Sequence, residues 1–491
     1  MIKQQKPFSF KTTIRRTALL SSLLILTACS TIGPPPASQD PLVATSWPYT
    51  QEDSTLNAVL AAELPWWEFI RDKELQNVIS SSLRNNRDLH LAILRIEEAR
   101  AIYNIQSAEQ WPDVNIDGQG GRRGTPGDLN MSSSRVSSGE YGLSVGLSSW
   151  EIDLWGRISS LKEAALEEFL ATEFARHAVQ ASLIAEVGGA YLSLLELNER
   201  IQIAKQTIQS RQEGYRIFKR RYEVGSSSLL ELTQVETLLV QAEALLAQLE
   251  QQRGNLSHAL TVLVGTPVNL SQQQQLKPAE HMFSPIQVGI PSEVLQKRPD
   301  VVSAEHRLRA SNANIKAARA AFFPRIGLTS TIGTASAELD GLFDSGSKAW
   351  QFIPVISLPI FDGGSRQANL DLAQVRSHMA VSEYEKTIQN AFREVADALN
   401  DRHWLTEQVD LGQRIVSIQQ RRAYLANLRY DSGAVDYLEV LDAQRELLTA
   451  QQNLAEAQGK LLISHVNLYA ALGGGTELKQ ELTTHPTPIS E

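Results

Sequence analysis

Apolar side chains recur every seven residues near the end of the chain. One series falls at Val440, Leu447, Leu454, Leu461 and Leu468, and a second falls one position later, at Leu441, Leu448, Ala455, Leu462 and Tyr469. Two adjacent series give a helix an apolar face wide enough to contact two neighbouring helices. The pattern therefore predicts a long helix that packs between partners on both sides.

A turn precedes this helix and begins at Arg429 and Tyr430. Gly433 suits the left-handed conformation that ends a helix. Asp436 stands at the expected start of the next helix, with Glu439 three residues later, which predicts an N-cap close to a capping box. These residues therefore form the tip of a helical hairpin.

A second copy of this hairpin pattern lies upstream, in residues 221–239. Both copies begin with Arg-Tyr, place a glycine three residues after the tyrosine and enter the next helix with Leu-Glu. A repeat of this length indicates a duplicated structural unit. Chance similarity between two coiled coils is the alternative, but it does not account for the matching turn residues.

Each half of the chain predicts a helix, two strands, a long helix, a turn and a return helix. The expected helices cover 73–110, 158–222, 229–264, 298–323, 365–430 and 437–472. Segments with a two-residue alternation predict four strands, each with one apolar face, at 114–117, 141–148, 326–332 and 350–360. Gly-rich loops are expected between the paired strands, at 120–139 and 333–347.

The first 28 residues predict a targeting segment. A basic stretch and a short apolar core end in Leu26-Thr27-Ala28-Cys29, which resembles the cleavage site of bacterial lipoproteins. We expect cleavage before Cys29 and acylation of its sulfur, for example with palmitate, and Ser30 favours export to the outer membrane. Cys29 is the only cysteine, which excludes an intramolecular disulfide.

These features divide the chain into six expected parts. They are a lipoprotein signal peptide (1–28), an acylated tether (29–65), a first structural repeat (66–265), a linker (266–297), a second structural repeat (298–473) and a polar C-terminal tail (474–491). No stretch after the signal peptide reaches 18 consecutive apolar residues, so we expect no transmembrane helix.

Four strands with one apolar face cannot close into a membrane barrel, because the smallest such barrels have about eight. An open sheet would expose unpaired backbone groups to lipid, which offers them no hydrogen bonds. Several copies must therefore combine their strands. Two copies would supply eight strands and three would supply twelve, and the pattern does not choose between them.

Several motifs are spread in order over nearly the whole chain after the signal peptide. Among them are Trp66-Trp67, Asn85-Asn86-Arg87-Asp88-Leu89, Asp153-Leu154-Trp155-Gly156-Arg157, Arg298-Pro299-Asp300-Val301, Phe323-Pro324 and Leu441-Asp442-Ala443-Gln444-Arg445. With these motifs the chain resembles the TolC-type outer membrane efflux channels, and within them the lipoprotein branch typified by OprM and NodT.

The resemblance implies a mainly helical fold with a membrane β part. It implies a homotrimer with a twelve-stranded β-barrel in the outer membrane, a twelve-helix tunnel in the periplasm, and an equatorial collar made by the N-terminal, linking and C-terminal segments. Such a channel conducts small molecules passively. Its implied partners are outer membrane lipid, a periplasmic adaptor protein and an inner-membrane pump of the RND type.

The resemblance also implies a periplasmic aperture at the second hairpin. Leu438 and Asp442 would narrow the mouth, and Tyr430 would belong to the hydrogen bonds that hold it shut. Acids at a hairpin tip are often only caps or solvated charges, and Glu439 fits that alternative as well as an aperture role. In the upstream repeat Gln234 stands in place of Asp442, so the acid ring would come from one hairpin per chain.

Charge and composition exclude several other functions. Loss of the signal peptide removes five basic and no acidic residues and moves the net charge from −9 to −14, which argues against a nucleic-acid partner. The nine histidines are scattered, so no metal site is expected, and neither a cofactor nor an enzymatic function is indicated. The main alternative to a channel is a lipid-anchored periplasmic coiled-coil protein with a structural role, which would leave the four strands unexplained.

Overall fold

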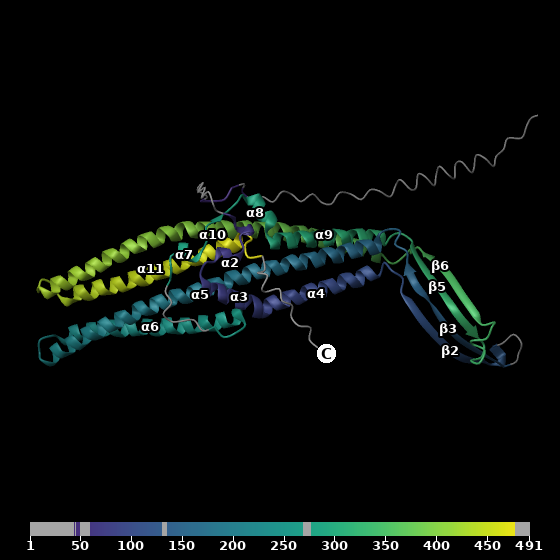
Figure 1. Ribbon diagram of the computed structural model, residues 1–491, viewed down its shortest axis with the longest axis horizontal. Coiled ribbons are helices and arrows are strands. Elements are labelled where there is room, and N and C mark those ends of the chain that lie inside the picture. The colour runs from purple at the N-terminus through teal and green to yellow at the C-terminus, as the bar shows by residue number, and fades with distance from the viewer. Residues whose placement is uncertain (1–43, 45, 50–58, 130–134, 269–275, 477–491) are drawn as a thin grey trace, which may run out of the picture. The chain divides into compact units, whose positions relative to one another are not determined.

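Two helices of 67 residues each, α5 (Arg157–Glu223) and α10 (Ser365–Asp431), dominate the computed structural model (Figure 1). The structure describes residues 44, 46–49, 59–129, 135–268 and 276–476. Contacts divide the chain into residues 1–41 and 42–491, and every element below belongs to the second unit. The predicted signal peptide, Cys29 and nearly all of the polar tail lie outside the described residues.

An aspartate a few residues upstream sets the start of each long helix. Asp153 accepts hydrogen bonds from the backbone N–H groups of Ile158 (3.2 Å) and Ser159 (2.7 Å). Asp362 accepts one from the backbone N–H of Arg366 (3.1 Å). Because the first turn of a helix leaves N–H groups without helical partners, a carboxylate in this place satisfies them and balances the helix dipole.

Each long helix turns back as expected, α5 into α6 (Leu229–Val264) and α10 into α11 (Tyr437–Ala471). Contacts between α5 and α11 join the two hairpins, so the four helices follow the order α6, α5, α11, α10. Gly459 permits the close approach of α11 to α5, since a Cβ atom there would lie 2.7 Å from the side chain of Glu196. The order leaves α6 and α10 as the two outer helices.

The helix expected over 73–110 is broken into α3 (Lys73–Asn85) and α4 (Arg87–Ala108). Asn86 lies between them in an extended conformation, with φ −64° and ψ 130°. Its side-chain oxygen accepts a hydrogen bond from the backbone N–H of Leu89 at 2.9 Å, which caps α4. The prediction of one continuous helix is therefore wrong, because Asn86 starts a new helix instead of continuing the old one.

The same asparagine joins α4 to the end of α6. Its Nδ2 donates to the carbonyl of Leu263 (2.9 Å), and the Ser82 hydroxyl donates to the same carbonyl (2.7 Å). Gly265 ends α6 against this junction, since a Cβ atom there would lie 2.4 Å from the Asn85 carbonyl oxygen. The last carbonyl groups of a helix lack helical partners, so these side chains satisfy them.

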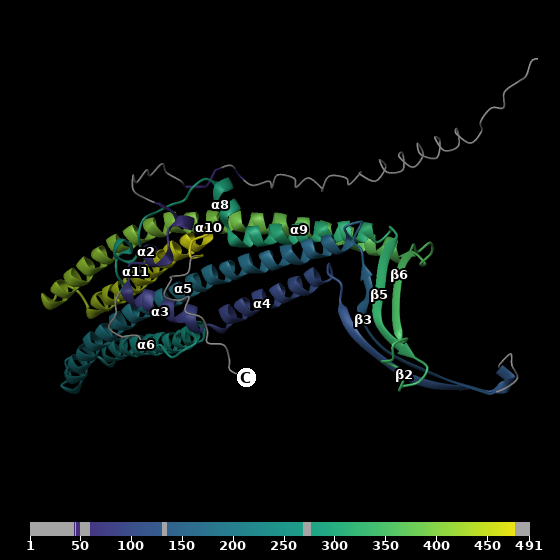
Figure 2. The same ribbon diagram turned by 45° about the vertical axis from the view of Figure 1, so that its right-hand side comes forward.

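An equivalent junction in the second half joins α9 (Pro299–Ala320) to the end of α11. Proline occupies the first position of α9, as the sequence predicts. Arg298 donates from Nη1 to the carbonyl of Ala471 at 2.8 Å. α4 thus packs against α5, and α9 packs between α5 and α10, in the half of the helical part that leads to the sheet (Figures 1 and 2).

Four long strands form one antiparallel sheet in the order β2 (Val114–Thr125), β3 (Val136–Glu151), β5 (Arg325–Ser336) and β6 (Lys348–Ser357). The central pair, β3 and β5, joins the two halves of the chain. The strands extend well into the loops expected at 120–139 and 333–347, because the Gly-rich segments pair through their backbones. Within the described residues, β2 and β6 each pair on one side only.

The register places most large apolar side chains on one face of the sheet. Directly paired residues point to the same side of a sheet. Val114 of β2 pairs with Leu147 of β3, and Val145, two residues earlier in β3, lies on the same face. Val145 pairs with Ile332 of β5, which pairs in turn with Trp350 of β6, so all four strands share this face. The residues of this face are Val114, Ile116, Leu143, Val145, Leu147, Leu328, Ile332, Trp350, Phe352 and Ile356. The other face carries mainly small and polar residues, such as Asn115, Asp117, Ser144, Thr331 and Gln351.

Short elements form a belt around the middle of the helices. They are β1 (Val59–Leu60), η1 (Ala61–Glu63), α2 (Trp66–Phe69), α3, α7 (Ala279–Met282), β4 (Ile286–Gln287) and α8 (Pro291–Lys297). A further 3₁₀ helix, η2 (Gly127–Leu129), lies beyond β2. Because β1 and β4 form a parallel pair, the described residues contain six strands and not the four expected.

Tyr469 ties this belt to both ends of the described chain. Its ring stacks on Phe69 at 4.1 Å between centroids, and its hydroxyl donates to the Leu64 carbonyl at 2.6 Å. The same hydroxyl accepts a hydrogen bond from the backbone N–H of Gly475 at 2.9 Å. The largest apolar core lies here and includes Trp66, Phe69 and Tyr469.

Among the helices that the structure describes, α5 is long and apolar enough to cross a membrane by length and composition alone. The sequence predicts no transmembrane helix after the signal peptide. More than half of the apolar 18-residue window of α5, 56%, is buried in the structure, where α5 packs against α4, α6, α9 and α11. Helix packing therefore accounts for its apolar residues.

We predict that Asn86→Ala lowers the midpoint of thermal unfolding, measured by circular dichroism in detergent. The substitution removes the cap of α4 and one partner of the Leu263 carbonyl, contacts that contribute about 1 kcal/mol each. Asn85→Ala is the matched control, because the Asn85 amide bonds only within its own helix, to Ser81. Equal effects of the two substitutions would contradict this account of the junction.

Candidate functional site

The turns of the two hairpins lie at the end of the helices away from the sheet (Figures 1 and 2). Aromatic rings connect them near the turns. The ring of Phe218 in α5 lies 4.3 Å from that of Tyr437 in α11, and the ring of Tyr430 lies 4.8 Å from Tyr437. Burial, reinforced by Tyr430, raises the pKa of Tyr437, so this contact stays uncharged at neutral pH.

Tyr430 also connects the hairpins through its hydroxyl. That hydroxyl accepts a hydrogen bond from Arg221, which belongs to the last turn of α5. The Arg221 guanidinium lies 5.4 Å from the ring centre of Phe218, a cation–π distance. One residue of the predicted aperture therefore holds the tip of α10 to the tip of α5.

Asp442 lies in a cluster of charges on the second hairpin. Its carboxylate accepts hydrogen bonds from Arg422 of α10 at 2.6 Å and from Arg445, one turn further along α11, at 2.5 Å. These side chains are 38–55% exposed, and exposed pairs of this kind stabilise by about 1 kcal/mol or less each. These ion pairs therefore add little to the apolar packing of Ala423 and Ala426 against Val440 and Ala443, which joins α10 to α11 at the same level.

Leu438 lies one turn before Asp442 and is 58% exposed. Within the described residues, this leucine leaves more than half of its side chain open to solvent near the tip of the second hairpin. Its counterpart in the first hairpin, Leu230, is 68% exposed. The two hairpins differ at the next turn, where Gln234 of α6 replaces the charged cluster around Asp442.

The predicted capping box at Asp436 is wrong. α11 begins at Tyr437 as expected, but the Asp436 side chain makes no capping hydrogen bond. Glu439, the expected partner, instead forms an ion pair with Arg429 across the turn, at 2.8 Å. A hydrogen bond to a charged donor is stronger than one to a backbone N–H, so Arg429 takes the carboxylate that the cap would need.

The first hairpin has the complete capping box that the second lacks. The Ser228 hydroxyl accepts from the backbone N–H of Glu231 at 3.1 Å, and the Glu231 carboxylate accepts from the backbone N–H of Ser228 at 2.8 Å. The hydrogen bonds that the Glu231 carboxylate accepts, first from the Ser228 backbone and then from the Ser227 and Ser228 hydroxyls, lower the pKa of Glu231. The first turn is thus fixed locally, whereas the second depends on pairs between its two helices.

Sequence reasoning missed two arginines near the tips. Arg422 approaches Asp442 from the other helix of the hairpin, so no local sequence pattern predicts the pair. Arg211 of α5 is only 6% exposed and donates from Nη1 to the Leu238 carbonyl of α6 at 2.5 Å. Its Nε and Nη2 have no hydrogen-bond partner in the described chain, and burial lowers its pKa.

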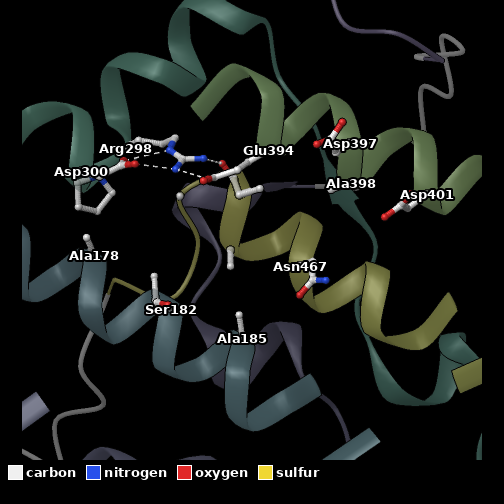
Figure 3. A pocket seen from close by; sticks show the side chains of 15 residues that line it. Ala178, Ser182, Ala185, Arg298, Asp300, Glu394, Asp397, Ala398, Asp401 and Asn467 are labelled. Atoms are coloured by element: carbon white, nitrogen blue, oxygen red, sulfur yellow. Dashed lines mark hydrogen bonds and ion pairs between the residues drawn. The ribbon is translucent and has the colours of Figure 1, made fainter. Parts of the chain in front are cut away.

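A cleft of about 530 Å³ opens between α5, α10 and the junction of α9 with α11 (Figure 3). Arg298 lies at one end, bound to Asp300 and Glu394 at 2.7 Å each, while Asp397 and Asp401 line the other side. Burial alone would lower the pKa of Arg298, but its two carboxylate partners raise it on balance. The described residues hold no group of three or more side chains suited to a metal ion.

Residues 78–266 and 290–474 match the family model described as outer membrane efflux protein. The two matched segments coincide with the two repeated halves of the fold. The chain belongs to the outer membrane efflux protein family. The resemblance to TolC-type channels is therefore confirmed.

Known members of the family are similar along most of their length. The antibiotic efflux pump outer membrane protein ArpC of Pseudomonas putida is 39% identical over 460 residues, which cover 93% of this chain and 95% of that protein. The cation efflux system protein CusC of Escherichia coli K12 is 39% identical over 411 residues, or 84% and 88% of the two chains. This efflux protein is thus a transport channel of the outer membrane, as predicted.

Solved structures show the same fold. The open state of the MtrE outer membrane channel of Neisseria gonorrhoeae superposes with a TM-score of 0.80 at 34% identity, covering 89% of this chain and 96% of that one. A membrane protein from Pseudomonas aeruginosa gives a TM-score of 0.82 at 39% identity, covering 89% and 98%. These neighbours are named as channels or membrane proteins, which favours the channel over an anchored structural coiled-coil protein.

We predict that Ser228→Ala speeds amide hydrogen exchange in the first turn of α6, because it removes a cap that stabilises by about 1 kcal/mol. That change corresponds to a roughly fivefold faster exchange of the Glu231 amide. Asp436→Ala is the matched substitution in α11 and should leave exchange at Glu439 nearly unchanged, since Asp436 makes no capping bond. A similar acceleration in both turns would show that Asp436 does cap α11.

Proposed function

We propose that three copies of this efflux protein form an exit duct through the outer membrane. The duct passively conducts small molecules that an inner-membrane pump of the RND type delivers through a periplasmic adaptor. The observation that carries the proposal is the four-stranded sheet, with one continuous apolar face and, within the described residues, two edges that pair on one side only.

Closure of the sheet requires strands from other copies. Unpaired edges cannot lie in lipid, and three copies supply the twelve strands of a barrel within the size range of known outer-membrane barrels. The same three copies supply twelve helices from α5, α6, α10 and α11, which continue the barrel as a tunnel. In this arrangement the repeats 66–265 and 298–473 form the wall, and the linker 266–297 belongs to an equatorial collar.

The duct imposes little chemical selectivity on what it carries. Relatives of nearly equal identity are named for antibiotic efflux, toluene efflux and cation efflux. The cargoes of these similar channels are chemically unrelated. This favours selection of the cargo by the pump and the adaptor rather than by a binding site in the duct. The adaptor and the pump are therefore the partners that determine the substrate.

The predicted aperture residues fit a gate at the end of the duct away from the membrane. Three copies of Leu438 would present apolar groups at the mouth, and three copies of Asp442 would add a ring of acids, which favours cations in other pores. The polar contacts near the tips are Arg422 with Asp442, Arg429 with Glu439, and Arg221 with Tyr430. An adaptor that opens the tips must break these contacts and separate the ring of Phe218 from that of Tyr437.

We predict that Leu438→Ala combined with Asp442→Ala raises single-channel conductance in planar bilayers and weakens the preference for cations. The substitutions remove apolar bulk and three negative charges from the mouth. Native mass spectrometry in detergent should still give three chains, because neither side chain lies in the sheet or the main core. Unchanged conductance would place the constriction elsewhere.

The first hairpin supplies the matched control for this gate. Leu230→Ala combined with Gln234→Ala removes the exposed leucine at the same turn of the first hairpin but no charge, so its effect on conductance and ion preference should be smaller. If this variant opens the channel as far as the first, the gate does not belong to the second hairpin.

We further propose that Cys29 becomes the acylated N-terminus of the mature protein, as the Leu26–Cys29 pattern suggests. Cys29→Ser should leave an uncleaved precursor and reduce the yield in the outer membrane. Mass spectrometry of the mature N-terminus decides the matter, because an unmodified N-terminus at another residue contradicts the anchor. Cleavage and acylation do not depend on the gate, so this result is independent of the conductance measurements.

A further inference from the structure

A second cleft, of about 500 Å³, lies between α5, α9 and α10 in the part of the helices that adjoins the sheet. α9 packs between the other two helices, and all three extend to the sheet (Figures 1 and 2). Small side chains contribute much of the lining, so the longer side chains around them border an open groove. The small residues are Ala310, Ala317, Ala318, Ala321 and Ala373.

Arginines provide most of the charge in this lining, although the chain as a whole is acidic, with a net charge of −9. They are Arg157, Arg307, Arg325 and Arg376. Arg157 binds the Glu151 carboxylate through hydrogen bonds of 2.9 and 2.8 Å. The other three are exposed, and none of them forms an ion pair with any residue that the structure describes. Glu168 also belongs to the lining, so four positive charges face two negative ones and the cleft is positive.

Two of the arginines lie where the helices meet the polar face of the sheet. Arg325 is the first residue of β5, and it points away from the face that carries Leu328, because successive strand residues alternate. Glu151, which binds Arg157, pairs with Gly327 on the polar face. An outer-membrane barrel turns its apolar face to lipid and its polar face inward. The cleft therefore opens to the interior of the proposed duct.

The other two arginines extend the positive charge along the helices. The Ser377 hydroxyl donates a hydrogen bond to Asn312 Oδ1 at 2.9 Å, which places Arg376 level with the middle of α9. Arg307 lies further from the sheet. Since a helix rises ~1.5 Å per residue, Arg307 is about 20 Å from the end of α9 that adjoins the sheet. The arginines thus form a line and do not converge on one point.

An anion with several phosphate groups matches this lining. A guanidinium group binds phosphate oxygens through two parallel hydrogen bonds. Because the arginines form a line, successive phosphate groups of one molecule can reach different arginines. Ser311, Asn314 and Asn369 add neutral hydrogen-bond donors to the same lining. The surplus of positive charge repels cations and attracts anions of high charge.

We infer that this cleft, called the arginine groove below, binds polyvalent phosphate anions inside the duct, directly below the barrel. The inference rests on the proposed assembly of three copies, which places three arginine grooves around one lumen. The proposed mouth carries the acids of Asp442, so the two ends of the tunnel have opposite charge. The groove does not select the cargo, which the pump delivers, but it retains polyvalent anions that enter from the barrel.

Calorimetric titration with inorganic tripolyphosphate tests the groove independently of conductance. The full-length protein, purified in detergent at low salt, should bind tripolyphosphate. Arg307→Gln combined with Arg376→Gln should weaken this binding roughly tenfold or more, because two charge-assisted contacts are lost while the side-chain amides remain. Absence of binding to the unsubstituted protein overturns the inference, and it leaves the trimer and its conductance unaffected.

Two arginines outside the groove supply the matched control. Arg319 of α9 and Arg414 of α10 are exposed, and neither forms an ion pair within the described part of the chain. Arg319→Gln combined with Arg414→Gln therefore removes the same charge from the same two helices and should leave the affinity nearly unchanged. Equal weakening by both double variants would indicate a general attraction to positive charge and would overturn the groove.

A lipid headgroup offers the same phosphate chemistry from a different source. Dihexanoylphosphatidylglycerol, a water-soluble lipid, should not displace tripolyphosphate, because it carries a single phosphate group and the groove opens away from lipid. Displacement that disappears in the variant with Arg307→Gln and Arg376→Gln would place the groove on the lipid side of the wall. That result would overturn the inference of a site inside the duct.

Conductance in planar bilayers connects the groove to the duct. Tripolyphosphate added on the barrel side should reduce the single-channel current, and addition on the hairpin side should reduce it less, because the acids of the mouth repel the anion. The variant with Arg307→Gln and Arg376→Gln should lose most of the block. Block that is unchanged in this variant, or equal from both sides, overturns the placement of the site. Binding in detergent by a protein that conducts no current removes the duct but keeps the arginines as a phosphate site.

Discussion

Hydrogen bonds from side chains to the last carbonyl groups of α6 and α11 hold the helical part of this channel together. Asn86 and Ser82 bind the Leu263 carbonyl, and Arg298 binds the Ala471 carbonyl. Without these bonds, two helix ends would meet with unsatisfied backbone groups in a buried place, which costs more than the bonds themselves contribute. α4 and α9 begin at these junctions and run toward the strands. They can start beside the ends of α6 and α11 only because the junctions are satisfied.

Duplication has left the two halves alike in fold and different at their tips. Both long helices start from an aspartate and a left-handed glycine, and both return through a glycine-containing turn. The first tip is fixed by Ser228 and Glu231 within a single turn, whereas the second is held by ion pairs between its helices. A local cap survives movement of the hairpin, while a pair between helices breaks when they separate, so the second tip is the one suited to open.

Much of the fold could be predicted from the sequence, because its helices are long and end at strong local signals. α6 matches its expected bounds, since a serine cap precedes it and a glycine ends it. The break at Asn86 could not be predicted, because the carbonyl that its amide binds lies 177 residues away. Strand lengths were underestimated for a related reason, since the Gly-rich ends of β2 and β3 carry no apolar alternation and are strands only through backbone pairing. At the tip, Leu438 and Asp442 lie in the first turns of α11, and their role in an aperture stays a prediction. Arg422, which binds Asp442, could not be predicted because it belongs to the opposite helix.

The contacts of Tyr469 have a consequence for how the chain can be made and exported. The tyrosine closes the belt by bonding the Leu64 carbonyl, 405 residues earlier in the sequence, and by receiving the N–H of Gly475. The central core therefore cannot be completed until almost the whole polypeptide has been synthesised, because its last member is nearly the last residue of the described chain. A nascent chain with an open core stays unfolded for longer, which is the state in which a polypeptide can be threaded across a membrane. The position of one aromatic residue in the sequence thus makes completion of the central core a late step in the folding of the chain.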